Sequence, residues 1–325
     1  MEPLLEIKDL FVEFCTERAR VKAINGLNFV INQGESVGLV GETGAGKTTA
    51  ALASLNLLAE TAIRSGEIYF HGKSVFSMKE KELNDMRGGK VSMIFQNPLT
   101  ALNPVFTVGE QIAVVLRVHQ KMGKKEAMEK AGQLLEMVGI PKSRVLDYPN
   151  QFSGGMRQRV GIASSLACNP ELLIADEPTT ALDVTIQAQI LELMKRLQLS
   201  YQTSLLMITH NLGIISELCQ KVAVIYAGRI IEYGTVKEVF TNPSHPYTVG
   251  LLGALPNVDE EKERLTAIPG DIADPRNLPE GCRFHPRCQF MTERCKVSQP
   301  EMVKISENHF VECWCQERAS GWIKQ

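Results

Sequence analysis

The chain has 325 residues, of which 44% are hydrophobic and 22% are charged, the composition of a soluble globular protein with room for one large domain and a smaller one. The formal net charge of −2 gives no electrostatic reason to expect a nucleic acid as partner. The N-terminus lacks a signal-peptide pattern, and no apolar run approaches the ~18 residues that span a bilayer. We therefore expect a cytosolic protein that reaches a membrane only through a partner.

Alternating and apolar runs predict a series of strands along the chain. In order, these strands are expected at residues 4–14, 27–31, 36–40, 65–72, 91–95, 171–175, 204–208, 222–226 and 229–233. The runs at 171–175 and 204–208 are almost wholly apolar, as in parallel strands that are buried on both faces. Between residues 108 and 138 the apolar period becomes helical, which predicts a helical insertion. After about residue 240 the alternation fades, and we expect a domain change there.

A glycine-rich loop follows the predicted strand 36–40 and precedes a helix-forming run. Its residues are Gly41, Glu42, Thr43, Gly44, Ala45, Gly46, Lys47 and Thr48, and Thr49 opens the helix. The glycines let backbone N–H groups close around phosphate oxygens at the positive end of that helix. We expect Lys47 to reach the β- and γ-phosphates and the Thr48 hydroxyl to ligate Mg²⁺. The order of strand, loop and helix predicts a nucleoside triphosphate site.

Polar residues stand at the ends of other predicted strands. Asp176 and Glu177 follow the strand 171–175, at the sheet edge where open α/β sheets bind ligands. We expect Asp176 in the Mg²⁺ shell and Glu177 to accept a proton from an attacking water. Gln96 is a candidate contact to Mg²⁺ or to that water, although a glutamine at a strand end is usually just exposed. His210 is a candidate γ-phosphate contact, although a lone histidine more often has a structural role.

One aromatic residue has two interpretations of similar weight. Phe14 ends the first predicted strand, just before a polar loop. The side chain either packs in the core or forms a platform on which adenine stacks, a type of contact worth ~1–3 kcal/mol per base in single-stranded nucleic acids.

A second helix start also favours anions. Ser153, Gly154 and Gly155 open a predicted helix, whose N-terminus attracts negative charge. Because the first loop already surrounds its own phosphates, this one needs a γ-phosphate from elsewhere, and a second subunit could supply it. As an isolated tripeptide, Ser-Gly-Gly indicates only a linker.

The ordered set of these motifs resembles the ATPase subunit of ABC transporters over about residues 4–240. The set comprises residues 41–48, Gln96, 153–158, 176–177, Ala181-Leu182-Asp183 and His210. More narrowly, residues 93–104, 176–187 and 245–248 are similar to the oligopeptide, dipeptide and nickel importer branch of that family. Met156, where most ABC signatures carry glutamine, resembles the D-type chain (OppD or DppD) of this branch more than its F-type partner.

The resemblance implies an α/β fold, the P-loop NTPase ABC cassette. In that fold a mixed, largely parallel sheet core carries an antiparallel β subdomain and a helical subdomain. The cassette is expected at residues 1–240, with the helical subdomain at about 97–150. A Cys-rich C-terminal extension is expected at residues 241–325.

The resemblance also implies an ATP-hydrolysing importer subunit, peripheral to the cytoplasmic face of the cell membrane. It would drive uptake of di- or oligopeptides through two permease subunits, with an extracellular or periplasmic solute-binding protein. ATP would lie between residues 41–48 of one chain and Ser153, Gly154, Gly155 and Met156 of another, an F-type paralogue or an identical chain. Asp183 would communicate across the dimer, and Gln96 and the helical insertion would face the membrane subunits. Nickel or another solute as cargo is one alternative, and a soluble, non-transport ABC ATPase is the other.

Five of the eight cysteines follow residue 280. Cys282, Cys288, Cys295 and Cys313 are separated by five, six and seventeen residues, with Cys315 close behind. We do not expect disulfides in a cytosolic chain. Structural zinc prefers shorter gaps between paired cysteines, and four thiolates also suit a [4Fe–4S] cluster. Residues 281–288 are similar to the C-terminal extension of peptide-importer ATPases, some of which carry such a cluster. We favour a cluster and leave zinc and metal-free thiols as alternatives.

Overall fold

The computed structural model describes residues 3–16, 19–96, 102–179, 184–254 and 268–315. The chain forms two compact units, each built from several segments. The first unit comprises Met1–Leu4, Ile31–Ser36 and Phe70–Ile208. The second unit comprises Leu5–Val30, Val37–Tyr69 and Thr209–Gln325.

Three parallel strands form the buried sheet of the first unit. In the order β8-β7-β6 they are β8 (Ser204–Thr209), β7 (Leu172–Asp176) and β6 (Val91–Ile94). Leu172 of β7 is in register with Val91 on one side and with Ser204 on the other. Every residue of the three strands is buried. This confirms the prediction from their apolar runs, since parallel strands covered on both faces need apolar side chains on both.

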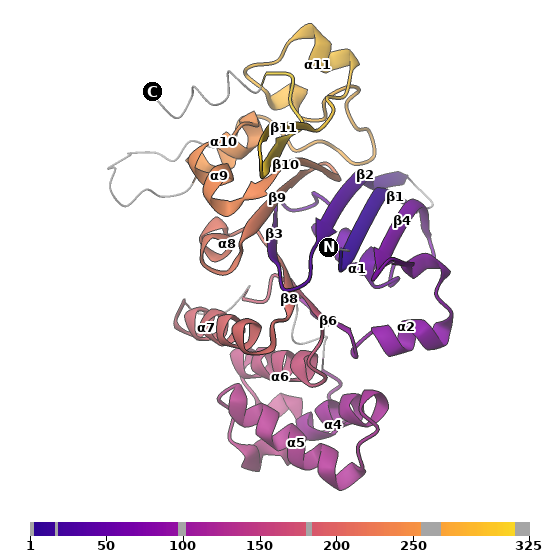
Figure 1. Cartoon of the computed structure of the whole chain (residues 1–325), viewed down its shortest axis with the longest axis vertical. Coiled ribbons are helices and arrows are strands. Elements are labelled where there is room, and N and C mark those ends of the chain that lie inside the picture. Colours follow the sequence, from indigo (N-terminus) through magenta and orange to yellow (C-terminus); the bar gives the residue numbers. More distant parts are fainter. Residues whose placement is uncertain (1–2, 17–18, 97–101, 180–183, 255–267, 316–325) are drawn as a thin grey trace. The chain divides into compact units, whose positions relative to one another are not determined.

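Helices make up most of the rest of the first unit. They are α2 (Glu80–Met86), α4 (Val108–His119), α5 (Lys124–Met137), α6 (Gly154–Leu166) and α7 (Val184–Tyr201), with short 3₁₀ turns at Val75–Ser77, Lys142–Leu146 and Pro149–Gln151 and the short strand β5 (Lys73–Ser74). Figure 1 shows α4, α5 and α6 packed side by side, in magenta. The predicted helical stretch at 108–138 is two helices, because Lys121 has a φ of 58° and Gly123 is extended, which ends one helix and caps the next.

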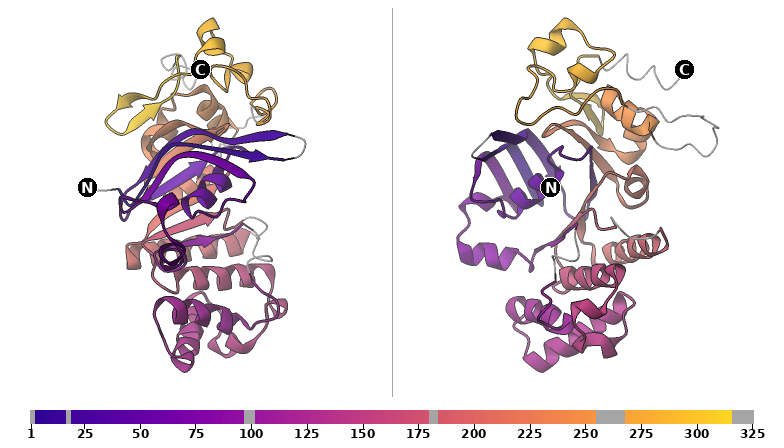
Figure 2. Two further views of the ribbon diagram at one scale, coloured as in Figure 1. Left: turned by 90° about the vertical axis from the view of Figure 1, so that its right-hand side faces the viewer. Right: turned by 180° about the vertical axis from the view of Figure 1, so that it is seen from behind.

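The second unit contains two groups of strands. The first group has the order β2-β1-β4 and comprises β2 (Arg20–Ile31), β1 (Leu5–Cys15) and β4 (Ala62–Phe70). Figure 2 shows these indigo and purple strands side by side. The second group has the order β3-β9-β10-β12-β11 and comprises β3 (Ser36–Val40), β9 (Lys221–Tyr226), β10 (Arg229–Thr235), β12 (His309–Val311) and β11 (Val303–Ser306). Within it, β3 and β9 are parallel, and the pairs from β9 to β11 are antiparallel.

The C-terminal strands β11 and β12 extend the sheet beyond the predicted hairpin of β9 and β10. That hairpin turns at Ala227 and Gly228, as predicted, and both residues have a positive φ. Tyr233 of β10 then pairs with Phe310 of β12. The strands β11 and β12 have four and three residues, too few for an alternating pattern to stand out in the sequence.

Short helices complete the second unit. They are α1 (Lys47–Ser54), α8 (Leu212–Leu218), α9 (Val236–Thr241), α10 (Pro246–Gly253) and α11 (Glu293–Val297), with the 3₁₀ turn η4 (His285–Arg287). In the parts of the chain that the structure describes, no helix combines the length and apolar character needed to cross a membrane.

Candidate functional site

The phosphate-binding loop joins the buried strand β3 to helix α1, as the sequence predicts. Two of its glycines are required by their surroundings. A Cβ atom on Gly41 would lie 2.3 Å from the carbonyl oxygen of Ile225. Gly46 has a φ of +101°, and a Cβ there would lie 2.6 Å from the carbonyl oxygen of Ala23. Only glycine fits these two positions, so the backbone of β9 and β2 fixes the path of the loop.

The loop curls around the ammonium group of Lys47. The side chain is 7% exposed, and its Nζ donates hydrogen bonds to the carbonyl oxygens of Gly41 (2.8 Å) and Glu42 (3.1 Å). The carbonyl oxygen of Glu42 also accepts from the N–H of Ala45, at 3.2 Å. Thr48 is exposed in the first turn of α1. The loop therefore presents a positive charge and a helix N-terminus together, the arrangement that binds phosphate.

In the first unit, the structure brings together two of the predicted catalytic residues. Asp176 ends β7 and is 2% exposed, and Glu177 follows it with a φ of 45°. The backbone N–H of Glu177 donates to the carbonyl oxygen of Ile208 at 2.8 Å. The Gln96 amide, just after β6, donates from Nε2 to Oε2 of Glu177 at 3.1 Å. The acidic pair and the glutamine therefore share the carboxyl edge of this sheet.

The other predicted nucleotide contacts stand on other elements of the chain. Ser153 is the N-cap of α6, where its Oγ accepts from the N–H of Met156 at 3.4 Å, and both Ser153 and Gly154 are exposed. In the second unit, Phe14 is half-buried on β1 and His210 is exposed after β8. Asp183 lies outside the described residues. An exposed helix N-terminus opened by Ser-Gly-Gly is open to an anion from another molecule.

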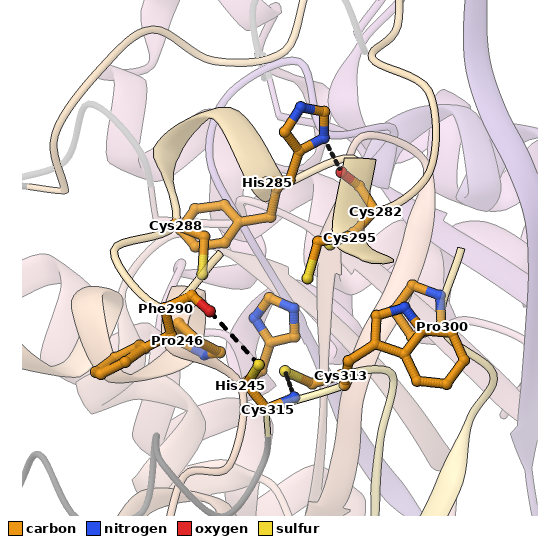
Figure 3. A pocket seen from close by; sticks show the side chains of 12 residues that line it. His245, Pro246, Cys282, His285, Cys288, Phe290, Cys295, Pro300, Cys313 and Cys315 are labelled. Carbon is orange, nitrogen blue, oxygen red and sulfur yellow. Dashed lines mark hydrogen bonds between the residues drawn. The ribbon is translucent and has the colours of Figure 1, made fainter. Parts of the chain in front are cut away.

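The five C-terminal cysteines line one cavity in the second unit, together with His245, His285 and Trp314. Figure 3 shows Cys288, Cys295, Cys313 and Cys315 lining the same cavity as His245. All eight cysteines lie in the described parts of the chain, and there they are free thiols. Burial raises the pKa of Cys282 and Cys288 to about 11 and that of Cys313 to about 12.

Among the described residues, no group of three His, Cys, Asp or Glu side chains has the spacing that holds a single metal ion. This result concerns a single metal ion such as zinc, whereas the cavity shared by the cysteines concerns a larger group. Four sulfurs about 2.3 Å from one zinc ion must lie close together, whereas a four-iron cluster is larger and holds its cysteines farther apart. The spacing here therefore does not suit one zinc ion as it stands, and cysteine is the residue type that ligates iron–sulfur clusters.

His245 is a buried polar group that the cavity leaves unsatisfied. The side chain is 1% exposed, and burial lowers the pKa of its imidazole to about 3, so the ring is neutral. Its Nδ1 accepts from the N–H of Tyr247 at 3.0 Å, which leaves the proton on Nε2. In the described part of the chain, Nε2 has no hydrogen-bond partner. A buried donor of this kind is available to an acceptor bound in the cysteine cavity.

Two residues that the sequence analysis did not assign to the nucleotide site contact the loop. The hydroxyl of Tyr247 accepts from the N–H of Glu42, and Arg287 forms an ion pair with the Glu42 carboxylate. They are 205 and 245 residues away from Glu42 in the chain. The sequence signals were the similarities at residues 245–248 and 281–288, and neither assigned these two residues to the nucleotide site.

Comparisons with known proteins identify the family of the chain. The ABC transporter family model matches residues 24–180, and the model of the oligopeptide/dipeptide transporter C-terminal region matches residues 231–295. The oligopeptide transport ATP-binding protein OppD of Haemophilus influenzae is 46% identical over 316 residues, which cover 97% of this chain and 98% of that protein. OppD of Bacillus subtilis is 49% identical over 316 residues, covering 96% of this chain and 88% of that protein.

A solved structure with a similar fold is the ATP-binding cassette MJ0796, a dimer in a post-hydrolysis state bound to ADP and Pi. It superposes with a TM-score of 0.64 and 26% identity, over 71% of this chain and 98% of that chain. The match supports the P-loop cassette with its mixed sheets and helices. With relatives this similar over almost its whole length, the chain belongs to the ATP-binding proteins of the ABC transporter family, in the oligopeptide/dipeptide transporter group.

Proposed function

We propose that this chain is the ATP-binding and ATP-hydrolysing subunit of an ABC importer that powers the uptake of di- or oligopeptides through partner permeases. The observation that carries the proposal is the loop closed around Lys47, in a chain 46–49% identical to two oligopeptide transport ATP-binding proteins. An ABC cassette at residues 1–240, a helical subdomain at about 97–150 and a Cys-rich C-terminal extension at 241–325 complete the proposal. The matched regions at 24–180 and 231–295 support this division.

In the proposed reaction, water attacks the γ-phosphate of ATP in line with the leaving ADP. Glu177 accepts the proton of that water. Gln96, whose amide donates a hydrogen bond to the Glu177 carboxylate, orients the water. Lys47 exchanges its loop carbonyls for the β- and γ-phosphates, and His210 contacts the γ-phosphate. The hydroxyl of Thr48, the carboxylate of Asp176 and the amide oxygen of Gln96 are oxygen donors of the kind that Mg²⁺ prefers. When bound, Mg²⁺ neutralises charge that develops on the phosphates.

We place the second half of the nucleotide site on another ATPase chain, an F-type paralogue or an identical copy. Ser153, Gly154, Gly155 and Met156 of one chain then close over the γ-phosphate held by the loop of the other. The exposed N-terminus of α6 supports this arrangement, as does the dimeric state of the related cassette. In the same dimer, Phe14 stacks on the adenine and Asp183 communicates between the chains.

Substitution at Ser153 tests this shared site. We expect Ser153→Arg to bind nucleotide normally but to abolish hydrolysis by the assembled pair, because the arginine blocks the helix terminus from the γ-phosphate. Light scattering and phosphate release measure assembly and turnover. A strictly monomeric preparation that hydrolyses ATP at full rate, whether or not Ser153 is changed, would contradict the proposal.

The membrane partners are proposed to be two permease subunits, with the chain peripheral to the cytoplasmic face and a solute-binding protein on the outer side. A pocket at the end of β6 supports a docking site; it is lined by Phe95, Leu102, Arg157 and Gln158, among others. Gln158 is 3% exposed there, and its Nε2 has no hydrogen-bond partner among the described residues. Nearby, Val105 and Phe106 are 69% and 51% exposed. Co-purification of two permeases with the tagged chain tests the membrane association.

The cargo distinguishes this proposal from its alternatives. Subunits other than this one select the cargo, so nickel or another solute fits the same ATPase. The names of the relatives favour peptides. The ligand of the co-purified solute-binding protein identifies the cargo, whereas co-purification of ribosomes and no permease would indicate a non-transport ATPase.

We further propose that Cys282, Cys288, Cys295 and Cys313 hold a [4Fe–4S] cluster, with zinc as the alternative. The support is the cavity that they share and the unsatisfied Nε2 of His245 beside it. Anaerobic purification tests it: a brown protein that absorbs near ~400 nm and contains iron supports the cluster. A colourless protein with zinc supports the alternative, and a colourless sample without metal rejects both.

A further inference from the structure

Glu42, in the phosphate-binding loop, is held by groups from the far end of the chain. Its backbone N–H donates to the hydroxyl of Tyr247 at 2.9 Å. Its carboxylate accepts two hydrogen bonds from Arg287, from Nη1 at 2.7 Å and from Nη2 at 3.1 Å. Its carbonyl oxygen accepts from Lys47 and Ala45 inside the loop. Glu42 therefore connects the ammonium group that meets the phosphates with two residues of the C-terminal part.

The contact between Arg287 and Glu42 is largely buried and specific in geometry. The side chain of Arg287 is 4% exposed and that of Glu42 is 24% exposed. Burial alone would lower the pKa of Arg287, but its hydrogen bonds to Glu42 and Tyr226 raise the pKa by more than burial lowers it. The net shift is upward, so the guanidinium stays charged. Two parallel N–H···O bonds fix the carboxylate in both direction and distance. The position of Glu42 is therefore tied to that of Arg287 by two hydrogen bonds with little access to solvent.

Both residues that hold Glu42 belong to elements that line the cysteine cavity. Arg287 ends the turn η4, between His285 and Cys288, which both line it. Tyr247 is in the first turn of α10, whose N-cap His245 also lines it and accepts from the N–H of Tyr247.

The ring of Phe284, the N-cap of η4, packs beside the start of α10. It lies 5.5 Å from the rings of both His245 and Tyr247. Arg287 in turn donates its backbone N–H to the carbonyl oxygen of Phe284 at 3.0 Å. The turn η4 and the start of α10 are therefore in contact through one side chain that lines the cavity.

We propose that Arg287 and Tyr247 are positioning residues of the phosphate-binding loop, and that they couple it through Glu42 to the cysteine cavity, so that filling the cavity with its metal centre strengthens nucleotide binding. The inference rests on the proposed ATP site and metal centre and adds a link between them. A ligand bond to Cys288 fixes the residue next to Arg287. A sulfur acceptor for Nε2 of His245 fixes the cap of the helix that carries Tyr247.

The test measures the dissociation constant of MgADP by calorimetry, on the full chain purified anaerobically with its metal. The same protein is measured again after EDTA and ferricyanide have removed the metal and gel filtration has removed the reagents. Removal should weaken MgADP binding by about 5-fold or more, the usual lower range of coupling between two sites. The variants are Arg287→Met and Tyr247→Phe, with metal content and visible absorbance recorded for each.

In these variants the link is already cut, so we expect weaker MgADP binding that no longer depends on the metal, with metal content like that of the original chain. Arg276→Met is the matched control. Arg276 also forms a fork with a carboxylate, that of Asp274, in the same part of the chain, but it is 63% exposed. This control should keep the full dependence on the metal. If Arg287→Met does not fold, Arg287→Lys, which keeps the charge without the fork, replaces it.

The outcomes separate this inference from the proposals on which it rests. An unchanged dissociation constant after metal removal contradicts the coupling, and so does an equal loss of affinity in the original chain and in both variants. A merely structural role of Arg287 or Tyr247 would make the variants less stable both with and without metal. The coupling instead predicts that the variants lose MgADP affinity only in the metal-loaded state. A chain that never contains metal contradicts the proposed metal centre and this inference with it. A loaded chain that does not bind MgADP contradicts the proposed function.

Discussion

Gln96 and Glu177 are joined by a hydrogen bond of 3.1 Å from the amide of one to the carboxylate of the other, across the ends of the neighbouring parallel strands β6 and β7. Glu177 holds this position with a φ of 45°, in the left-handed region that non-glycine residues rarely adopt. Such a conformation costs of order 1–3 kcal/mol and persists where the surroundings impose it. Here the hydrogen bond from its N–H to Ile208 helps to hold it. This carboxylate is the proposed general base.

Replacing Glu177 by glutamine tests that role. Glu177→Gln keeps the size and the contact to Gln96 but cannot accept a proton. We therefore expect ATP binding to persist and hydrolysis to slow by ~100-fold or more. Phosphate release and nucleotide binding by the assembled ATPase pair measure the two effects. Glu171→Gln, which changes a carboxylate just before β7, is the control and should turn over normally; near-normal turnover of Glu177→Gln would remove Glu177 from the role.

Adding a methyl group to Gly41 should distort the phosphate-binding loop. The new Cβ would meet the carbonyl oxygen of Ile225 at 2.3 Å, and backbone cannot yield as a flexible side chain does. Because overpacking of this kind costs ~1–3 kcal/mol, we expect Gly41→Ala to weaken MgADP binding by about 10-fold or more. Gly253→Ala is the control, since a Cβ there meets nothing within 4 Å. Equal affinities of the two variants would show that the close approach to Ile225 does not shape the loop.

The buried carboxylate of Glu232 should be important for the stability of the C-terminal part. It is 0% exposed and accepts from the N–H groups of Ser244 (2.6 Å) and His245 (2.9 Å) and from Nε2 of His309 (2.7 Å). Glu232→Ala leaves these donors buried without an acceptor, so the free energy of unfolding should fall by ~3–5 kcal/mol. Urea unfolding followed by tryptophan fluorescence measures the change.

The exposed ion pair of Glu293 and Lys296 provides the comparison for Glu232. Its glutamate is 87% exposed, and Glu293→Gln should leave the unfolding midpoint almost unchanged. If Glu232→Ala unfolds at the same urea concentration as Glu293→Gln, the buried network does not stabilise this part of the protein.

Helix α4 begins with a reciprocal cap. The Thr107 hydroxyl accepts from the N–H of Glu110 at 3.2 Å, and the Glu110 carboxylate accepts from the N–H of Thr107 at 3.0 Å. Thr107→Ala removes the hydroxyl, and we expect a loss of ~1 kcal/mol in the free energy of unfolding. Thr107→Ser retains the hydroxyl and should lose much less. Thermal unfolding of the two variants side by side is the measurement, and indistinguishable midpoints would contradict the role of the cap.

The fully buried strands were the easiest part of the fold to predict, because a strand that is covered on both faces has a nearly continuous apolar sequence. In β3, β7 and β8 every residue is buried, and their sequences are correspondingly apolar. The break between α4 and α5 was missed because Lys121, unlike glycine, gives no sequence signal for the left-handed conformation that it adopts.

The nucleotide site also has one part that could be predicted from local sequence and another that could not. The loop at 41–48 could be recognised because glycine, lysine and threonine act at fixed spacing within a few residues of one another. Glu177 was predicted from its place after an apolar strand, but its bond to Gln96 depends on the pairing of β6 with β7. The positions of Tyr247 and Arg287 beside Glu42 have no local signal at all.

By itself, then, the sequence determined that this chain holds a nucleoside triphosphate, through a loop whose chemistry lies in eight consecutive residues, and that its last cysteines form a group. Only the tertiary structure decided that His245 shares their cavity and that Arg287 and Tyr247 reach back to Glu42. The reason is physical: backbone conformation and side-chain periodicity are set by neighbours along the chain, whereas contacts over more than 200 residues arise only when the packed sheet brings distant segments together.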